Sequence, residues 1–254
     1  MHSPSESLEA ALAEPARTLP DRVVLITGGA RGLGAALAEV LGGAGARIAL
    51  VDRDMDGAQN VARRLSERGI EASAHELDVG DEAQVRECLG VLQRRYGALD
   101  VVINNAGVDV TAPISELSSE DWERIVRTNL TGPFLMAKQA LTVMTRGGHI
   151  VNICSTAAKR SWPNASAYHA SKWGLLGLSH ALHAELRGAG IKVTAVVAGG
   201  MRTPFLLERF PDLDPQLLQD PLDVARTVRF VLTQPAATVI PEVMVLPMRE
   251  TSWP

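Results

Sequence analysis

The sequence predicts an α/β fold: a single domain with a doubly wound parallel sheet of about seven strands and helices on both faces. Short apolar, β-branched runs alternate strictly with helical patterns of about 10 to 15 residues, which favours right-handed crossovers between parallel strands. A glycine-rich turn joins the first of these strands to the first helix. At 254 residues, of which 46% are hydrophobic, the chain can bury one large core.

The first half of the chain supplies four of the expected strands. Val23–Thr27 is apolar and β-branched and runs into glycines, which is typical of a central parallel strand. Further strands are expected at 47–52, 71–77 and 99–105, and helices at 33–43, 57–68 and 82–96. We expect residues 1–20, which contain three prolines, to form a flexible extension that could carry a short helix over 8–13.

The second half continues the alternation after a turn-rich segment at 111–118. One long helix is expected over 119–145, then a buried strand at 148–154, a helix at 165–187, a strand at 191–197, a helix at 222–233 and a last strand at 242–246. Residues 204–220 combine three prolines with large apolar side chains, so we interpret them as a flap over a substrate pocket within the domain of residues 21–254.

The glycine-rich turn predicts a dinucleotide site. Thr27-Gly28-Gly29-Ala30-Arg31-Gly32-Leu33-Gly34 lies directly between a strand and a helix. Its glycines permit a tight turn and a close approach of the backbone to a pyrophosphate, and the helix N-terminus then faces the phosphates. The arrangement is that of a Rossmann-type fold, with Gly28, Arg31, Gly32, Leu33 and Gly34 as cofactor-binding residues.

The residue that closes the second strand bears on which dinucleotide binds. Asp52 follows Gly34 by eighteen residues, where a carboxylate accepts the ribose hydroxyls and repels a 2'-phosphate. Arg31 and Arg53 flank the same region and would hold such a phosphate. We therefore favour NAD and keep NADP as the alternative.

Three polar residues predict hydride-transfer chemistry. Tyr168 and Lys172 are four residues apart, so on a helix they project from one face. Ser155 stands at the end of an apolar strand, thirteen residues before the tyrosine. Because an ammonium favours a neighbouring phenolate, we expect Lys172 to lower the pKa of Tyr168 from its ordinary value of about 10. The phenol would then serve as a general acid or base.

Composition excludes several other classes of function. The net charge is -4, with 25 basic and 29 acidic residues and no basic face, so no nucleic-acid partner is expected. No apolar run is long enough for a membrane span, and the N-terminus does not resemble a signal peptide. The two cysteines, Cys88 and Cys154, fall in different elements and suit a reducing compartment, so a cytoplasmic protein is expected. Among six histidines only His180 and His183 are closely spaced, and no metal site is expected.

These residues resemble the classical short-chain dehydrogenase/reductase family over residues 22–246. The family's motifs are matched by Thr27, Gly28, Gly32, Gly34, Asp78-Val79, Asn104-Asn105-Ala106-Gly107, Asn129, Ser155, Tyr168, Lys172 and Thr203. The resemblance implies a catalytic tetrad of Asn129, Ser155, Tyr168 and Lys172, in which Asn129 anchors a water of a proton relay. It also implies that Asp78 and Val79 contact the adenine, that Asn105, Ala106 and Gly107 line the cofactor site, that Lys172 binds the nicotinamide ribose and that Thr203 meets the carboxamide.

The chain departs from the family's pattern at two places. Ala198-Gly199 stands where the family usually has Pro-Gly, which adds backbone freedom before Thr203. The last strand ends in Val245-Leu246-Pro247-Met248 rather than in a glycine-rich segment. These departures put in doubt the pose of the carboxamide and the usual contacts of the tail.

The expected substrate is a small secondary alcohol or ketone. Ser155 and Tyr168 would meet its oxygen, and Trp162 and Phe205, with Leu206, Leu207 and Phe210, would form an apolar wall. Arg160 and Arg202 are candidates for an anionic group. The resemblance further implies a homotetramer or homodimer through apolar residues of the 119–145 and 165–187 helices, namely Phe134, Leu135, Leu141, Leu175, Leu176 and Leu178.

Two other functions stay open. The first is an NADPH-dependent ketoreductase acting on a 3-oxoacyl group bound to a carrier or to coenzyme A, against which Asp52 argues. The second is a dinucleotide sensor that kept the fold without turnover, because fold alone does not establish activity.

Overall fold

The computed structural model describes residues 18–249 and contains one seven-stranded, all-parallel sheet. Its strands lie in the order β3-β2-β1-β4-β5-β6-β7. They are β1 (Val23–Thr27), β2 (Arg47–Asp52), β3 (Ala72–Glu76), β4 (Leu99–Asn104), β5 (Met144–Ser155), β6 (Lys192–Ala198) and β7 (Glu242–Val245). The predicted doubly wound sheet is confirmed, and its strand order reverses between β1 and β4.

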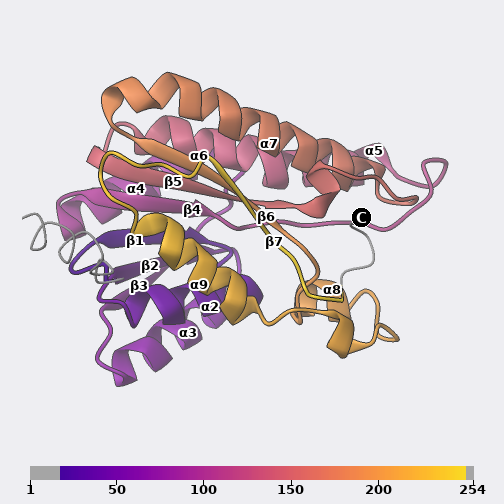
Figure 1. Cartoon of the computed structure of the whole chain (residues 1–254), viewed down its shortest axis with the longest axis horizontal. Helices are drawn as coiled ribbons and strands as arrows, with labels where there is room; N and C mark the ends of the chain where they lie inside the picture. Colours follow the sequence, from indigo (N-terminus) through magenta and orange to yellow (C-terminus); the bar gives the residue numbers. More distant parts are fainter. Residues whose placement is uncertain (1–17, 250–254) are drawn as a thin grey trace, which may run out of the picture.

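Helices cover both faces of this sheet (Figure 1). The main helices are α2 (Gly32–Gly42), α3 (Met55–Glu67), α4 (Glu82–Tyr96), α5 (Ser119–Val126), α6 (Gly132–Ala140), α7 (Ser166–Leu186) and α9 (Pro221–Leu232). In Figure 1, α2, α3 and α9 form the lower layer, and α5, α6 and α7 lie above the sheet. No helix within residues 18–249 is long and apolar enough to cross a membrane.

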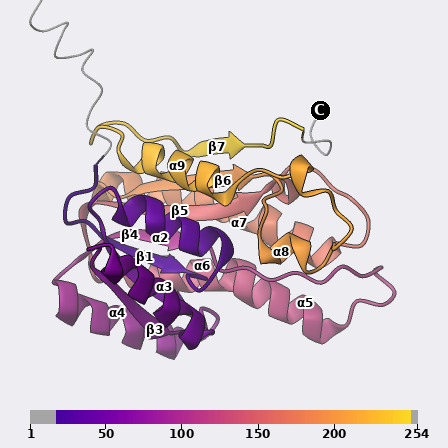
Figure 2. The same cartoon turned by 90° about the horizontal axis from the view of Figure 1, so that it is seen from below.

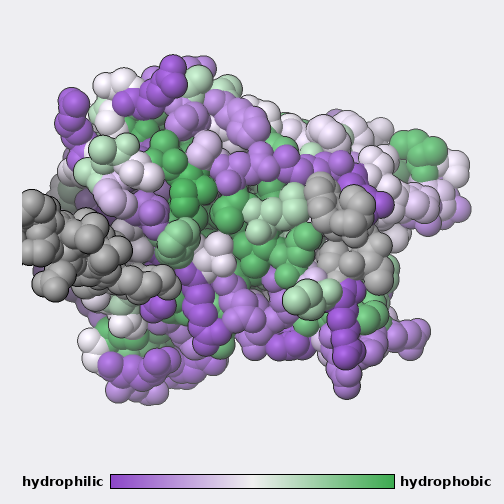
Figure 3. All heavy atoms as spheres, in the orientation of Figure 1, coloured by the Kyte–Doolittle hydropathy of each residue, from purple (hydrophilic) through white to green (hydrophobic). Residues whose placement is uncertain are grey.

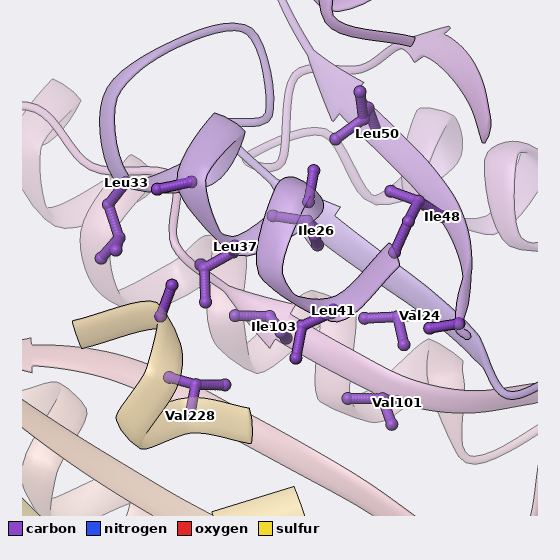
Figure 4. Close-up of a cluster of buried hydrophobic side chains, with 14 of the residues drawn as sticks. Val24, Ile26, Leu33, Leu37, Leu41, Ile48, Leu50, Val101, Ile103 and Val228 are labelled. Carbon is purple, nitrogen blue, oxygen red and sulfur yellow. The ribbon is translucent and has the colours of Figure 1, made fainter. Parts of the chain in front are cut away.

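The core follows from the alternation of side chains along the central strand. Val24 and Ile26 of β1 point to one face and pack with Leu37 and Leu41 of α2 (Figure 4). Val23 and Leu25 point to the other face, into a second cluster that α4 and α6 complete. Each of these strand residues is at most 1% exposed. Since successive residues of a strand face opposite sides, a fully apolar strand is the one buried between two helical layers.

The segment between β4 and β5 differs from the long helix expected at 119–145. It contains α5, then a π-helical stretch at Arg127–Thr131, then α6, which ends at Ala140, and β5 already begins at Met144. Pro133 lies just after the π-helical stretch. Proline lacks the N–H of a regular helical turn and crowds the carbonyl four residues earlier, which explains why the helix widens here.

Two segments lie outside the main strands and helices: the start of the described chain and the flap of residues 204–220. The described part of the predicted extension packs on the domain, because Leu19 is 1% exposed and its N–H donates to the Ala44 carbonyl at 2.7 Å. The short helix expected at 8–13 lies outside the described residues. The 204–220 segment contains a short helix, α8 (Pro204–Leu207), and a 3-10 turn (Pro215–Leu217). In Figure 2, β7 points toward the side of the molecule where α8 lies.

Candidate functional site

A cavity of about 1200 Å³ lies at the carboxyl ends of the strands, where doubly wound sheets bind their ligands. Residues of the glycine loop, of the ends of β2, β4 and β5, of α7 and of the flap line it. Most residues proposed from the sequence for the cofactor, catalytic and substrate roles line this cavity; the exceptions are Gly34, Asn129, Arg160, Arg202 and Leu207. The volume of the cavity is therefore large enough for a dinucleotide and a second small molecule. Residues from several elements are available to contact them.

The glycine loop is tied to the end of β4 across the point where the strand order reverses. The Thr27 hydroxyl oxygen accepts from the backbone N–H groups of Asn105 and Ala106, both at 2.9 Å. The Asn105 amide in turn donates to the carbonyls of Thr27 and Gly28 at 2.9 and 3.1 Å. Asn105 thus holds the loop in place from inside the protein.

Two glycines of this loop are required by close approach. Gly28 has φ +67°, and a Cβ there would lie 2.9 Å from the Ala106 Cα. A Cβ on Gly34 would lie 2.0 Å from the Gly28 carbonyl oxygen, so α2 packs directly on the loop. Gly34 therefore acts by packing and does not line the cavity. Gly32, with φ +56°, lies against Thr203, which brings the start of the flap next to the loop. The tight cradle of backbone N–H groups at the start of α2 fits a pyrophosphate.

The part of the cavity at the end of β2 is lined by carboxylates. One oxygen of Asp52 accepts from the Ala30 N–H and the other from the Asp54 N–H, both at 3.0 Å, so this carboxylate is fixed beside the loop. Farther along, Asp78 accepts from the Gly80 N–H at 2.9 Å and pairs with Arg127 at 3.5 Å. Its neighbour Val79 packs against Gly132 at the start of α6.

Ser155, Tyr168 and Lys172 come together beneath the flap. The Ser155 side chain hydrogen-bonds to the Tyr168 hydroxyl, and its oxygen also accepts from the Ala157 N–H at 3.1 Å. The Lys172 ammonium lies 5.7 Å from the centre of the Tyr168 ring and donates to the Ile153 carbonyl at 2.9 Å. The strand end and the helix thus place a hydroxyl, a phenol and an ammonium at one site.

The pKa of Tyr168 differs in direction from the sequence-based expectation. Burial raises it to about 12, while the Ser155 hydrogen bond opposes this effect. Lys172 is not among the groups that shift it. Burial also lowers the pKa of Lys172 itself. The expectation that Lys172 lowers the pKa of Tyr168 toward neutrality is therefore wrong for this structure, in which burial has the larger effect.

Asn129 lies in the π-helical stretch and does not line the cavity. It is fully buried, and its side chain makes two hydrogen bonds with the Val108 backbone, both at 2.8 Å. It also donates to the Ser171 hydroxyl at 3.1 Å, on the helix of Tyr168 and Lys172. Asn129 thereby joins the segment after β4 to α7.

Two aromatic residues predicted for the substrate wall, Phe205 and Trp162, line the cavity. The Phe205 ring lies 6.0 Å from the ring of Tyr168. The Trp162 ring packs edge-on against the His169 ring, with 4.3 Å between the ring centres, and the backbone N–H of Trp162 donates to His169 Nε2 at 3.1 Å. The other ring nitrogen of His169 donates to the Ala157 carbonyl at 2.9 Å. His169, which the sequence did not single out, therefore holds the tryptophan loop against α7.

A glutamine side chain links the two places where the chain departs from the family's pattern, after β6 and after β7. The Gln219 amide donates to the carbonyls of Gly199 and Val245, at 3.2 and 3.1 Å, and so joins the end of β6 to the end of β7. Arg202 donates to the Leu218 carbonyl at 2.8 Å and pairs with Asp220. It thus braces the end of the flap instead of meeting an anion in the cavity.

Sequence reasoning missed two ion pairs that tie the flap to the rest of the cavity. Glu208 pairs with Arg31 of the glycine loop at 2.8 Å, and Arg209 pairs with Asp109, which follows β4. The partners are 177 and 100 residues apart in the sequence. Asp109 could have been suspected from its place just after a strand end, whereas nothing in the sequence distinguishes Glu208 or Arg209 from surface charges.

Comparisons with known proteins agree with this geometry. Residues 22–214 match the family model described as short chain dehydrogenase. An uncharacterized oxidoreductase of Thermotoga maritima is 34% identical over 227 residues, which are 84% of this chain and 89% of that protein. The structure of a metagenomic short-chain oxidoreductase in complex with NADP is 32% identical with a TM-score of 0.80, covering 91% of this chain and 98% of the other. The actinorhodin polyketide ketoreductase with NADPH is also 32% identical, with a TM-score of 0.82 over 90% and 97%.

Proposed function

The chain belongs to the short-chain dehydrogenase/reductase family of oxidoreductases, and on that premise we propose that it interconverts a ketone and a secondary alcohol by hydride transfer. The observation that carries this proposal is the Tyr168 hydroxyl, hydrogen-bonded to Ser155 in the same cavity as the glycine loop. A bound nicotinamide dinucleotide supplies or accepts the hydride there.

The protein's own residues handle the oxygen and the proton. The Ser155 hydroxyl donates to the carbonyl oxygen of the substrate, and Tyr168 donates the proton that turns this oxygen into a hydroxyl. The Arg209 guanidinium, which lowers the pKa of Tyr168, stabilises the phenolate left behind, and Lys172 would hold the nicotinamide ribose. Asn129 fixes Ser171 and the Val108 backbone, so that α7 keeps its place during the transfer.

The protonation state of Tyr168 at neutral pH is the one that ketone reduction requires. With a pKa of about 12 the phenol is protonated throughout the physiological range and is ready as a general acid. Alcohol oxidation needs the phenolate and therefore gains from alkaline pH.

For the cofactor we propose NAD(H), with NADP(H) as the alternative. Asp52 is held by two backbone N–H groups where a ribose would be recognised, and its charge disfavours a 2'-phosphate. Arg31, one of the two candidates for binding such a phosphate, is paired with Glu208. The related metagenomic enzyme binds NADP, which supports the alternative. Asp52→Ala should weaken NAD binding more than NADP binding in calorimetric titrations, and equal losses would contradict the ribose role.

A 3-oxoacyl thioester is the rival substrate class, because a structural relative is a polyketide ketoreductase. Turnover of acetoacetyl-coenzyme A can be compared with that of a free ketone of similar size. A kcat/KM more than tenfold higher for the thioester would favour the rival, whereas a higher value for the free ketone would favour the present proposal.

We also propose that the protein is a homotetramer or homodimer. Trp122 of α5, Phe134 of α6 and Trp173 of α7 are 39%, 45% and 51% exposed, although Leu135, Leu175 and Leu176 of the expected interface are buried in the core. Hydrophobic residues also gather around the edge strand β7 (Figure 3). Apolar surface of this kind is typical of an interface. A sedimentation run that shows only monomer would exclude it.

A cytoplasmic location is supported by the cysteines. Cys88 and Cys154 are both free and buried, and burial raises the pKa of each thiol to about 11, which keeps it protonated and unreactive. Localisation of a tagged full-length chain in its own cell tests this proposal.

The test of the function itself is a spectrophotometric screen at about 340 nm of secondary alcohols and ketones with NAD(H) and NADP(H) in parallel. Turnover of any carbonyl or alcohol would support the reaction. Dinucleotide binding without turnover across the panel would favour the sensor.

A further inference from the structure

The flap presents an apolar face to the cavity. Five of its side chains line the cavity, and none of them is buried: Phe205, Leu206, Phe210, Leu213 and Leu217. None of the five belongs to a buried core cluster of the described chain. Their accessible apolar surface therefore faces a hollow and not the core of the protein. Apolar surface of this kind in a concave site is where a ligand binds.

The spacing of these residues explains why they share one side of the flap. Leu206, Phe210, Leu213 and Leu217 follow one another at intervals of four, three and four residues. The Phe210 N–H donates to the Leu206 carbonyl at 2.9 Å, and the Leu213 N–H donates to the Phe210 carbonyl at 3.1 Å, so the chain coils between them. Side chains three and four residues apart in such turns lie on the same side. The polar residues between them are exposed and do not line the cavity: Glu208, Asp212, Asp214 and Gln216.

The charge on the inner side of this amphipathic flap is already paired. Arg209 is the one charged residue of the fully described segment 204–220 that lines the cavity, and its guanidinium pairs with Asp109. The same guanidinium lies 4.3 Å from the centre of the Phe205 ring and 5.5 Å from that of the Phe210 ring. A charged group placed under the flap would lose its hydration and gain no new partner. The part of a ligand that lies there is therefore uncharged and apolar.

The apolar face begins beside the reacting residues. The Phe205 ring lies 6.0 Å from the Tyr168 ring, and the face continues along the flap to Leu217. Trp162, from the segment after β5, lines the same cavity and is 39% exposed. The cavity of about 1200 Å³ also exceeds the roughly 300–1,000 Å³ that is typical of a site for one small ligand. An elongated molecule can thus place its carbonyl at Tyr168 and the rest of its length under the flap.

We propose that the substrate of this site is a ketone that carries a long, uncharged hydrocarbon group, and that the apolar face of the flap covers this group. The proposal rests on the proposed function, because the ketone is reduced in the same cavity. The sequence suggested a small substrate, whereas the extended apolar lining favours a longer one. Leu206, Phe210 and Leu213 then determine specificity by contact with the hydrocarbon and take no part in the proton transfer.

The first test is a series of methyl ketones from 2-butanone to 2-octanone, reduced with the dinucleotide that the protein uses. Each added methylene that leaves water for the flap should raise kcat/KM by about two- to fourfold, the size of the hydrophobic effect for one methylene. The whole series should therefore gain more than about tenfold. A carboxylate at the far end of the same chain, in 7-oxooctanoate, should lower kcat/KM at least about tenfold below that of 2-octanone.

The second test uses a matched pair of variants, Leu206→Ala and Leu207→Ala. The two leucines are neighbours in α8, but only Leu206 lines the cavity. Leu206→Ala should lower the ratio of kcat/KM for 2-octanone to kcat/KM for 2-butanone by about three- to tenfold, because apolar contact is lost. Leu213→Ala, at a second position of the apolar face, should act in the same way, and Leu207→Ala should keep the wild-type ratio. Thermal unfolding and dinucleotide binding establish that each variant is folded.

Three results would overturn the proposal. A kcat/KM that stays level or falls from 2-butanone to 2-octanone would show that no long group is bound, while turnover of the short ketones would still uphold the proposed function. Faster turnover of 7-oxooctanoate than of 2-octanone would show that the group is anionic. A wild-type ratio in both Leu206→Ala and Leu213→Ala would assign the hydrocarbon to other residues. If no ketone is reduced at all with either dinucleotide, the proposed function fails and this inference fails with it.

Discussion

Replacing Gly34 by alanine tests the packing of the glycine loop, on which the account of dinucleotide binding depends. The new Cβ would lie 2.0 Å from the Gly28 carbonyl oxygen, where ordinary van der Waals contact begins at 3.4 Å, so the two must separate by about 1.4 Å. The Gly28 carbonyl belongs to the backbone of the loop, so no flexible side chain can give way. Displacing a binding group by about 1 Å costs on the order of 100-fold.

We therefore expect the Kd for the dinucleotide to rise about 100-fold in Gly34→Ala, equivalent to about 2.7 kcal/mol of binding free energy. Isothermal titration calorimetry with NAD(H) and NADP(H) measures this directly. Gly177→Ala is a matched control, because a Cβ at this position of α7 meets nothing within 4 Å. The control should bind normally and gain about 0.5–1 kcal/mol of stability, since alanine is the better helix former. A Kd within threefold of wild type in Gly34→Ala would refute the packing argument.

Three further predictions concern the chemistry. Tyr168→Phe should reduce turnover at least 1000-fold, because general acid catalysis is lost, while the dinucleotide Kd changes less than threefold; near-normal turnover would exclude Tyr168 as the proton donor. The rate of ketone reduction should stay constant from about pH 6 to 10, because a pKa of about 12 keeps the phenol protonated, while alcohol oxidation should rise with pH; a reduction rate that falls around pH 7 would contradict this assignment. Glu208→Gln should raise the ratio of kcat/KM with NADP to kcat/KM with NAD by up to about fivefold, because releasing Arg31 from an exposed ion pair is worth at most about 1 kcal/mol. An unchanged ratio would show that Arg31 does not bind the 2'-phosphate.

The parts of this structure that sequence could predict depend on short-range patterns. The alternation of β1 and α2 and the glycines between them are local, and so is the four-residue spacing of Tyr168 and Lys172. Those patterns were sufficient for the sheet and for many of the residues that line the cavity. These patterns allow prediction because each depends only on the conformation of the segment in which it occurs.

The parts that sequence could not predict depend on contacts between distant segments. Asp109 and Glu208 acquire their roles only from partners 100 or more residues away. The raised pKa of Tyr168 likewise reflects burial by the assembled pocket, which its spacing from Lys172 does not encode. The π-helical stretch around Asn129 escaped prediction because the apolar pattern continues through it, although Pro133 was a local sign of an irregular helix.

The most direct test of the central claim follows the hydride itself. The protein is incubated with a ketone that the screen identifies and with the reduced dinucleotide carrying deuterium at the transferable position of the nicotinamide. We predict one deuterium on the carbinol carbon of the product alcohol, and none when Tyr168→Phe replaces the wild-type protein under the same conditions. An alcohol without deuterium at that carbon, or full labelling by the phenylalanine variant, would contradict hydride transfer assisted by Tyr168.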